Sequence, residues 1–198
     1  TPRVLIDSMV AVMKPELKDI IQDPAAGTGG FLIAANHYLR EHTNPDGWTE
    51  AQQKKYRNGT FYGMEHVQDT HRLALMNLML HGIESDPEAG GIRYGDTLGP
   101  DGQALGKLGA TLILTNPPFG KKSSTTIVAE DGKVTKEKET IERDDFWATT
   151  SNKQLNFVQH VRSLLKQHGR AAMVIPDNVL FEGGAGETIR RKLLHECD

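Results

Sequence analysis

The 198-residue sequence predicts an α/β fold, in which a doubly wound, mostly parallel sheet is covered by helices. Two observations support this prediction. First, short apolar runs alternate with amphipathic stretches, as in chains that build parallel sheets through right-handed crossovers. Second, most of the runs end in polar or glycine-rich turns, which is expected where the carboxyl ends of parallel strands form a ligand-binding edge.

The apolar runs predict strands, and the amphipathic stretches between them predict helices. The clearest strand is residues 112–114, an apolar run followed by two prolines that cannot donate to a ladder. The helix expected next to the second strand has a wide apolar face that includes Leu73, Met76 and Leu80. The predicted strands are residues 20–23, 60–65, 91–96, 112–114 and 169–176, and the predicted helices are residues 3–13, 31–40, 69–81, 154–166 and 186–195.

Two polar stretches interrupt this alternation. Residues 42–58 contain the turn signal Asn44-Pro45-Asp46-Gly47 and predict a surface insertion. Residues 120–150 offer little apolar surface to bury, and they predict a mobile loop that orders when DNA or a partner docks. We interpret residues 1–198 as one domain containing this loop, and as a fragment truncated at both ends, because no Met begins the chain and no strand follows the last predicted helix.

Composition excludes several classes of protein. The net charge is −3, whereas a stand-alone nucleic-acid-binding protein usually carries a basic surplus, so any DNA-binding charge is expected on another domain or subunit. No apolar run approaches the roughly 18 residues of a membrane-spanning helix. The single Cys197 excludes a disulfide framework and a Cys-based zinc site, and it suits a reducing cytoplasm. The histidines include no helically spaced pair with a third ligand, so we predict no metal site.

A turn of small residues, 23–30, follows the first predicted strand and opens the next helix, which is the position of a cofactor-binding loop. Its glycines are Gly27, Gly29 and Gly30, which differs from the G-x-G-x-x-G pattern of dinucleotide-binding proteins. Glycines let a ligand approach the backbone, and the N-terminus of a helix favours a carboxylate or phosphate. The alternative is a tight strand–helix turn that binds nothing.

Acidic or amide side chains end successive predicted strands at Asp23, Glu65, Asp96 and Asn116, so all four are expected at one edge of the sheet. Glu65 could accept the two hydroxyls of a ribose, and Asp96 could accept from an adenine amino group. Each of these two also has an ordinary explanation, an exposed surface carboxylate for Glu65 and a turn-forming residue for Asp96.

The sequence Asn116-Pro117-Pro118-Phe119 is the most specific signal. An exocyclic amine on a base is a poor nucleophile because its lone pair is delocalised into the ring. The Asn116 side-chain oxygen and the Pro117 carbonyl can each accept one N–H, which favours a tetrahedral nitrogen with its lone pair aimed at an electrophilic methyl group. Pro118 adds rigidity, and Phe119 offers a stacking surface for a flipped base. The alternative is a strand end with a buried Phe.

Two motifs in this order, residues 23–31 (Asp-Pro-Ala-Ala-Gly-Thr-Gly-Gly-Phe) and 116–119 (Asn-Pro-Pro-Phe), resemble those of the amino-group adenine-N6 DNA methyltransferases. More closely, the chain resembles the modification (M) subunit of type I restriction–modification systems. Residues 1–3 are similar to the N-terminal cofactor motif of that family, and residues 181–186 are similar to its late glycine turn. The resemblance implies a Rossmann-like methyltransferase fold and methyl transfer from S-adenosylmethionine to adenine N6.

The resemblance also implies site residues and partners. Its catalytic residues are Asn116, Pro117, Pro118 and Phe119, and its cofactor-binding residues are Thr1, Pro2, Arg3, Asp23, Ala26, Gly27, Thr28, Gly29, Gly30, Phe31, Glu65 and Asp96. The implied partners are DNA with a target adenine, a specificity subunit that reads the sequence and, in a restricting complex, a restriction subunit.

Two rival hypotheses remain open at this point. The same turn suits any planar NH2 group, so the acceptor could be a protein glutamine or a ribosomal-RNA guanine. Alternatively, the chain could be a non-catalytic scaffold that binds cofactor and partners. Cytosine C5 methylation is disfavoured, because it needs a cysteine nucleophile and Cys197 has no Pro-Cys context.

Overall fold

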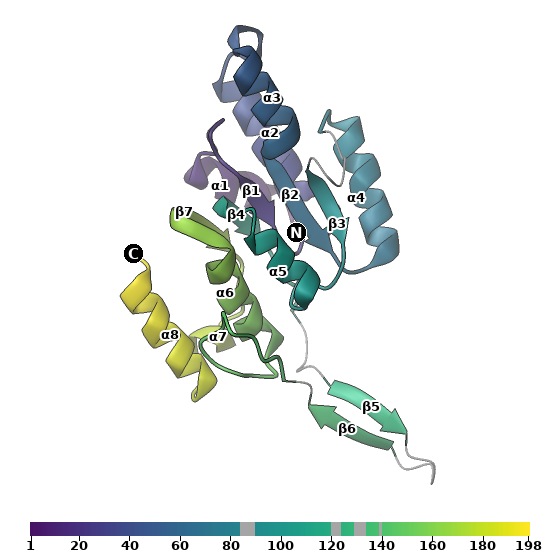
Figure 1. Ribbon diagram of the computed structural model, residues 1–198, viewed down its shortest axis with the longest axis vertical. Coiled ribbons are helices and arrows are strands. Elements are labelled where there is room, and N and C mark those ends of the chain that lie inside the picture. The colour runs from purple at the N-terminus through teal and green to yellow at the C-terminus, as the bar shows by residue number, and fades with distance from the viewer. Residues whose placement is uncertain (84–89, 120–123, 129–133, 139) are drawn as a thin grey trace. The chain divides into compact units, whose positions relative to one another are not determined.

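The computed structural model describes residues 1–83, 90–119, 124–128, 134–138 and 140–198 (Figure 1). The chain divides into two compact units. The first comprises residues 1–116 and 164–174, and the second comprises residues 117–163 and 175–198. The interpretation of residues 1–198 as a single domain stays a prediction.

A parallel sheet forms the centre of the first unit and confirms the predicted fold class. Over the described residues it has five strands in the order β3-β2-β1-β4-β7, and every neighbouring pair is parallel. The strands are β1 (Ile21–Asp23), β2 (Phe61–Glu65), β3 (Gly91–Tyr94), β4 (Ala110–Thr115) and β7 (Leu165–Met173). The order reverses between β1 and β4, and such a switch point is where open α/β sheets bind ligands.

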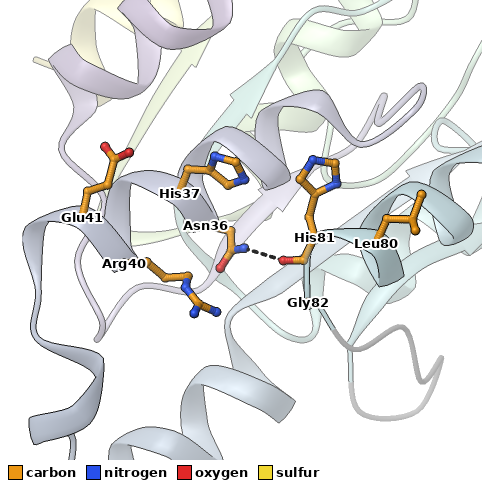
Figure 2. A pocket seen from close by; sticks show the side chains of 7 residues that line it. All are labelled: Asn36, His37, Arg40, Glu41, Leu80, His81 and Gly82. Carbon is orange, nitrogen blue, oxygen red and sulfur yellow. Dashed lines mark hydrogen bonds between the residues drawn. The ribbon is translucent and has the colours of Figure 1, made fainter.

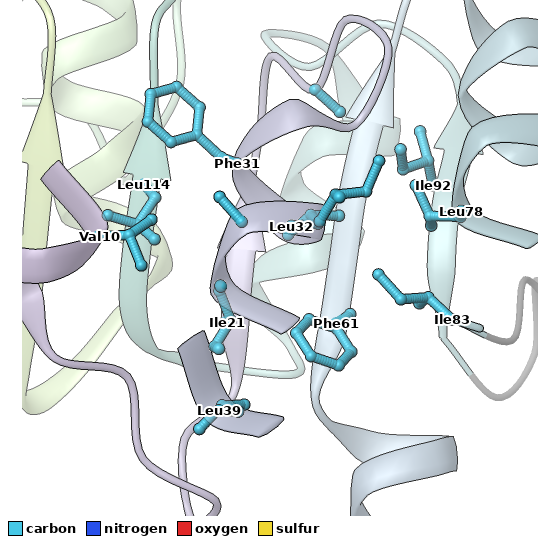
Figure 3. Close-up of a cluster of buried hydrophobic side chains, with 14 of the residues drawn as sticks. Val10, Ile21, Phe31, Leu32, Leu39, Phe61, Leu78, Ile83, Ile92 and Leu114 are labelled. Carbon is cyan, nitrogen blue, oxygen red and sulfur yellow. The ribbon is translucent and has the colours of Figure 1, made fainter. Parts of the chain in front are cut away.

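Strand β4 is buried on both faces, as its continuous apolar run predicts. Leu112 and Leu114 belong to a cluster formed with helices, whereas Ile113, which is also fully buried, is not part of that cluster. Figure 3 shows Leu114 next to Val10 in this cluster. The helices that contribute to the cluster are α1 (Arg3–Met13), α2 (Gly30–His42), α4 (Gln68–Leu80) and, through Tyr56 alone, α3 (Glu50–Gly59). The core of the first unit therefore lies between these helices and the sheet.

Residues 42–58 are largely exposed, as the predicted surface insertion requires, but they form helices that the sequence did not indicate. A short 3-10 helix, η1 (Pro45–Gly47), is followed by helix α3 (Glu50–Gly59). A capping box between Thr49 and Gln52 starts α3, and Tyr56 is its single buried side chain. With so little apolar surface the helix lacks the periodicity that sequence reasoning looks for, so the cap was the better signal. Helix α5 (Pro100–Gly106) is also short and was not predicted.

The prediction that α4 packs a wide apolar face against the core is wrong. Ala74 and Leu78 are its buried residues, a narrow stripe at i and i+4. The side chains of four large apolar residues are between 56% and 80% exposed, namely Leu73, Met76, Met79 and Leu80. Apolar periodicity identified the helix but could not choose which part of a broad face meets the sheet.

Three predicted boundaries shift. Strand β3 ends at Tyr94, so Asp96 lies in the following turn. Helix α6 (Lys153–Leu164) ends early and β7 begins at Leu165. A register shift in the pairing of β4 with β7 accommodates this early start, and His168 takes a left-handed conformation with φ of 62°.

The second unit contains an antiparallel pair, β5 (Ser124–Val128) and β6 (Val134–Lys138), and the helices α6, α7 (Asn178–Phe181) and α8 (Ala185–Glu196). The mobile loop predicted at residues 120–150 stays a prediction, but two segments of this stretch form the strands β5 and β6. Residues 120–123, 129–133 and 139 of that loop lie outside the described residues. Within the parts of the chain that the structure describes, no helix is both long and apolar enough to cross a membrane.

Candidate functional site

The candidate site lies at the carboxyl edge of the sheet, around the switch point between β1 and β4. Asp23 is the last residue of β1, and Glu65 is the last residue of β2. Thr115 ends β4, and Asn116 follows it directly. The parallel pairing places these strand ends on the same edge, as the sequence predicts.

The carboxylate of Asp23 is buried, with only 1% of the residue exposed. One of its two oxygens makes its hydrogen bonds. Its Oδ1 accepts the Thr115 hydroxyl at 2.7 Å and the Ala25 backbone N–H at 3.1 Å. Burial raises the pKa of Asp23 to about 7, because the two hydrogen bonds only partly offset desolvation and the nearby charge of Glu65 adds to it. Asp23 therefore changes charge near neutral pH.

The glycine turn after β1 contains two left-handed glycines with different surroundings. At Gly29, with φ of +82°, a Cβ atom would come within 2.5 Å of the Leu78 side chain, so this glycine is needed for packing. At Gly27, with φ of +54°, a Cβ atom would have nothing within 4 Å. Gly27 thus borders open space beside the strand ends, where a ligand can approach the backbone.

Glu65 turns toward this glycine turn. One of its carboxylate oxygens accepts the Gly27 N–H at 2.9 Å, and the other accepts the Val67 N–H at 2.8 Å. Each oxygen can accept a second hydrogen bond, so the carboxylate keeps capacity for the hydroxyls of a ligand. The structure therefore brings together the turn and the acidic residue that the sequence predicts as a pair.

Several residues that support the turn were missed by sequence reasoning. The Asn77 side chain donates to the Thr28 carbonyl at 2.9 Å, and the Thr97 hydroxyl donates to the Pro24 carbonyl. Gly63 in β2 lets the turn pack closely, because a Cβ atom there would lie 3.1 Å from the Cβ of Ala26. A glycine inside a predicted strand is a signal of such close approach. The asparagine and threonine have no comparable signature.

The Asn116 side-chain amide is engaged on one side only. Its Nδ2 donates to the Thr1 hydroxyl oxygen at 2.8 Å. Its Oδ1 is shielded from solvent and has no hydrogen-bond donor among the residues that the structure describes. A buried amide oxygen without a partner is costly, so a group that donates to it is strongly favoured.

Other predicted site residues have ordinary roles in this structure. Arg3 is exposed and pairs with Asp7 at 3.3 Å, and Phe31 is only 3% exposed within the core cluster. Asp96 is exposed, and its Oδ1 accepts the Leu98 N–H, which is the turn-forming role. Pro2 caps α1 through its carbonyl.

The remaining residues of the predicted catalytic motif begin the second unit. Pro117 is buried and Pro118 is exposed. The ring of Phe119 is 55% exposed, so the alternative of a buried Phe at this strand end is wrong. An exposed ring next to a Pro-Pro turn is available for stacking.

A surface pocket of about 510 Å³ lies where α2 and α4 end (Figure 2). Figure 2 shows Arg40 and His81 beside it, with the Asn36 amide donating to the His81 carbonyl at 3.1 Å. The cationic residues of α2 here complement the negative C-terminal end of a helix, which is a structural role. The pocket contains none of the predicted site residues, and we assign it no function. No group of metal-binding side chains is found among the described residues.

The N-6 DNA methylase family matches residues 1–198, the whole chain. The methylase subunit of the type I restriction enzyme EcoKI from Escherichia coli K12 is 46% identical over 202 residues, covering 100% of this chain and 34% of that protein. The crystal structure of the EcoKI M protein superposes with a TM-score of 0.82 at 45% identity, over 98% of this chain and 37% of that one.

A modification subunit of a putative type I restriction enzyme from Vibrio vulnificus YJ016 superposes with a TM-score of 0.74 at 30% identity, over 98% of this chain and 37% of that one. The chain thus spans about a third of the length of the curated relatives it matches. The predicted fold and family resemblance are both confirmed. The chain belongs to the N-6 DNA methylase family.

Proposed function

We propose that this chain is the catalytic region of an enzyme that transfers a methyl group from S-adenosylmethionine to the N6 amino group of adenine in DNA. The observation that supports this most directly is the Asn116 amide, whose Oδ1 is buried and unpartnered while its Nδ2 is bound to Thr1. An amide oxygen in this state is a ready acceptor for one hydrogen of a planar amine.

The chemical role of Asn116 follows from the nature of the adenine amine. When Oδ1 accepts one N–H, the nitrogen lone pair withdraws from the ring and becomes a better nucleophile. Asn116 directly follows a strand whose last four residues are fully buried, so its amide is supported by a rigid element rather than by a free loop. The Pro117 carbonyl is the proposed acceptor for the second N–H, and the exposed Phe119 ring is the proposed stacking surface for the flipped base.

The edge of the sheet fits an S-adenosylmethionine cofactor by two criteria. The backbone at Gly27 borders open space, which lets a ligand lie against it. Glu65 places a carboxylate beside this space, and the buried Asp23 nearby has no cationic group acting on it among the described residues. A cofactor that carries a sulfonium and an ammonium complements such charges. When bound, S-adenosylmethionine supplies the electrophilic methyl group.

The proposed roles of the other residues follow the same layout. Thr1, Gly27 and Asp23 are proposed to hold the methionine end of the cofactor, with Ala26 and the rest of the turn around it. Glu65 is proposed to bind the ribose, and Asp96 the adenine. Asp96 keeps one carboxylate oxygen beyond the one that accepts from Leu98, so its turn-forming role does not occupy the whole group.

DNA, a specificity subunit and, in a restricting complex, a restriction subunit are the proposed partners. The relatives are named as methylase subunits of type I restriction enzymes, which supports a multisubunit assembly. The net charge of −3 supports the same division of labour, because binding along the phosphates favours a surplus of positive charge, and in this chain acidic residues outnumber basic ones. The target adenine would then be selected by another subunit.

The test is the methylation state of DNA in a host with and without the gene. Sequencing for N6-methyladenine should find a modified motif in the presence of the gene and none in its absence. A mass-spectrometric search for the methyl group in protein, ribosomal RNA and DNA separates this proposal from the glutamine and guanine alternatives. If the intact assembly methylates no acceptor, the proposed function is overturned and the result favours the non-catalytic scaffold.

A further inference from the structure

We propose that Thr1 is a positioning residue that fixes the orientation of the Asn116 amide. This inference rests on the proposed function, because it assigns Asn116 Oδ1 to the substrate amine. The observation behind it is a single contact between side chains 115 positions apart, in which Asn116 Nδ2 donates to Thr1 Oγ1 at 2.8 Å. With Nδ2 held in this way, Oδ1 is the atom left to accept.

Orientation matters because a side-chain amide has two ends of almost the same shape. A rotation of half a turn would exchange Oδ1 with Nδ2 and present a donor to an amine that needs an acceptor. In that state the amide N–H would either repel the N–H of the substrate amine or bind its lone pair, and in both cases the lone pair would not be freed for the methyl group. Whatever holds the amide in the observed orientation therefore contributes directly to catalysis.

The Thr1 hydroxyl alone does not decide between the two orientations, since a hydroxyl can accept from Nδ2 or donate to Oδ1. The choice becomes fixed when the hydroxyl hydrogen is taken by another acceptor. Thr1 can then only accept, and the orientation with Nδ2 toward Thr1 keeps its hydrogen bond while the reversed one loses it. The carboxylate of S-adenosylmethionine is the acceptor we propose, which couples cofactor binding to the orientation of Asn116.

Both partners of the contact are held by rigid elements. Thr1 precedes the cap of α1, where the Pro2 carbonyl accepts the N–H groups of Leu5 and Ile6, and Ile6 is buried in the core cluster. Asn116 directly follows Thr115, which is fully buried and bound to Asp23. Thr1 itself is exposed, so removal of its hydroxyl is expected to leave folding almost unchanged.

The experiment compares Thr1→Val, Thr1→Ser and Ser8→Ala in the full-length protein within its assembly. Ser8 is the matched control, because it is an exposed hydroxyl on α1 that donates only to the Val4 carbonyl of its own helix. We measure kcat for adenine methylation at saturating cofactor and DNA, and the Kd of S-adenosylmethionine by calorimetry. We also record the side-chain NH2 resonances of Asn116 by NMR after selective labelling of asparagine with ¹⁵N.

At saturating cofactor, Thr1→Val should lower kcat roughly tenfold, because one neutral hydrogen bond no longer favours the amide orientation that presents Oδ1 to the substrate amine. Thr1→Ser should restore kcat to within about twofold of wild type, and Ser8→Ala should not change it. Cofactor binding to wild type should shift the Asn116 NH2 resonances, and this response should be lost in Thr1→Val and kept in Thr1→Ser.

An unchanged kcat in Thr1→Val with only a weaker Kd would overturn the proposal and make Thr1 a cofactor ligand alone. Failure of Thr1→Ser to restore kcat would also overturn it, since the hydroxyl would not be responsible. If wild type methylates no adenine, the proposed function fails instead. The NMR response then still decides whether Thr1 orients the amide, because it requires no turnover.

Discussion

The Thr115 hydroxyl donates to the Asp23 carboxylate at 2.7 Å, and this bond joins the end of β4 to the end of β1. It connects the residue before Asn116 with the residue that opens the glycine turn. At the other end of the same two strands, the Thr111 hydroxyl donates to Asp19 at 2.8 Å. The two bonds differ in surroundings, because the Arg170 guanidinium pairs with Asp19, and no such cation acts on Asp23 among the described residues.

The two threonines therefore form a matched pair of variants. Thr115→Val should lower the free energy of unfolding by about 1–2 kcal/mol, since the buried Asp23 loses a donor, and should weaken cofactor binding roughly fivefold or more. Thr111→Val should lower the free energy of unfolding by a similar amount and leave cofactor binding unchanged. Urea unfolding and calorimetry with S-adenosylmethionine measure the two quantities. Equal cofactor affinities in both variants would show that the bond has only a structural role.

The pKa of Asp23 predicts how stability depends on pH. Burial raises the pKa from 3.8 to about 7 in the folded protein, so the folded state holds a proton that the unfolded state has released between these values. The contribution of protonated Asp23 to the free energy of unfolding is therefore present at low pH and is lost as the pH rises toward about 7. Asp23→Asn keeps an oxygen for Thr115 but cannot ionise, so it should gain roughly 2–3 kcal/mol over wild type between about pH 5 and pH 8. If the urea midpoints of wild type and Asp23→Asn differed by a constant amount across this range, the raised pKa of Asp23 would be contradicted.

Gly27 and Gly29 should respond differently to the same substitution. Gly27→Ala adds a methyl group to the open space beside the turn, so it should weaken cofactor binding at least roughly tenfold while strain costs only about 1–2 kcal/mol of stability. Gly29→Ala adds a clash with Leu78 to the same strain and should lower the free energy of unfolding by roughly 2–5 kcal/mol. Calorimetry and urea unfolding separate the effects. A reversed order of the two variants in either assay would count against an open ligand-binding face at Gly27.

His160 predicts a pH effect of the opposite sign in the second unit. It is fully buried, and its Nδ1 accepts from Arg143 at 3.2 Å. Burial, together with the positive charge of Arg143, lowers its pKa from 6.5 to about 3. The unfolded state therefore binds a proton first, and stability is lost as pH falls from about 6.5 toward 3.

Replacement of His160 should remove the loss of stability that its imidazole causes at low pH. His160→Gln keeps an acceptor for Arg143, and the wild type should become less stable relative to the variant by a few kcal/mol as pH is lowered from about 7 to about 4. The measurement is the urea midpoint of each protein across this range. Parallel pH profiles would mean that His160 is not neutral in the folded state.

The sequence was sufficient for the parts of the fold that depend on buried strands and special turns. The apolar run before Asn116 and the glycine turn after Asp23 predicted β4, β1 and their meeting at one edge of the sheet. These features need particular residue types, because only an apolar run fits a strand buried on both faces and only glycine takes the left-handed conformation without strain.

The features that sequence reasoning missed depend on tertiary contacts. The side of α4 that meets the core is set by how the helix packs on β2 and β3, so Leu73 and Leu80 gave a false signal. Helix α3 has a single buried residue, and its start is shown by a cap rather than by periodicity. The contacts of Thr115 with Asp23, and of Thr1 with Asn116, join residues about 90 to 115 positions apart. No local pattern contains such pairs.

The measurement that tests the central claim most directly is N6-methyladenine formation by wild type, Asn116→Asp and Asn116→Ala in the intact assembly. Wild type should transfer the methyl group from S-adenosylmethionine to adenine, and Asn116→Ala should lose at least about a hundredfold in kcat with cofactor binding retained, because the amine loses its acceptor. Asn116→Asp keeps an oxygen at this position and should retain measurable activity. Wild-type rates of adenine methylation in Asn116→Ala would contradict the account.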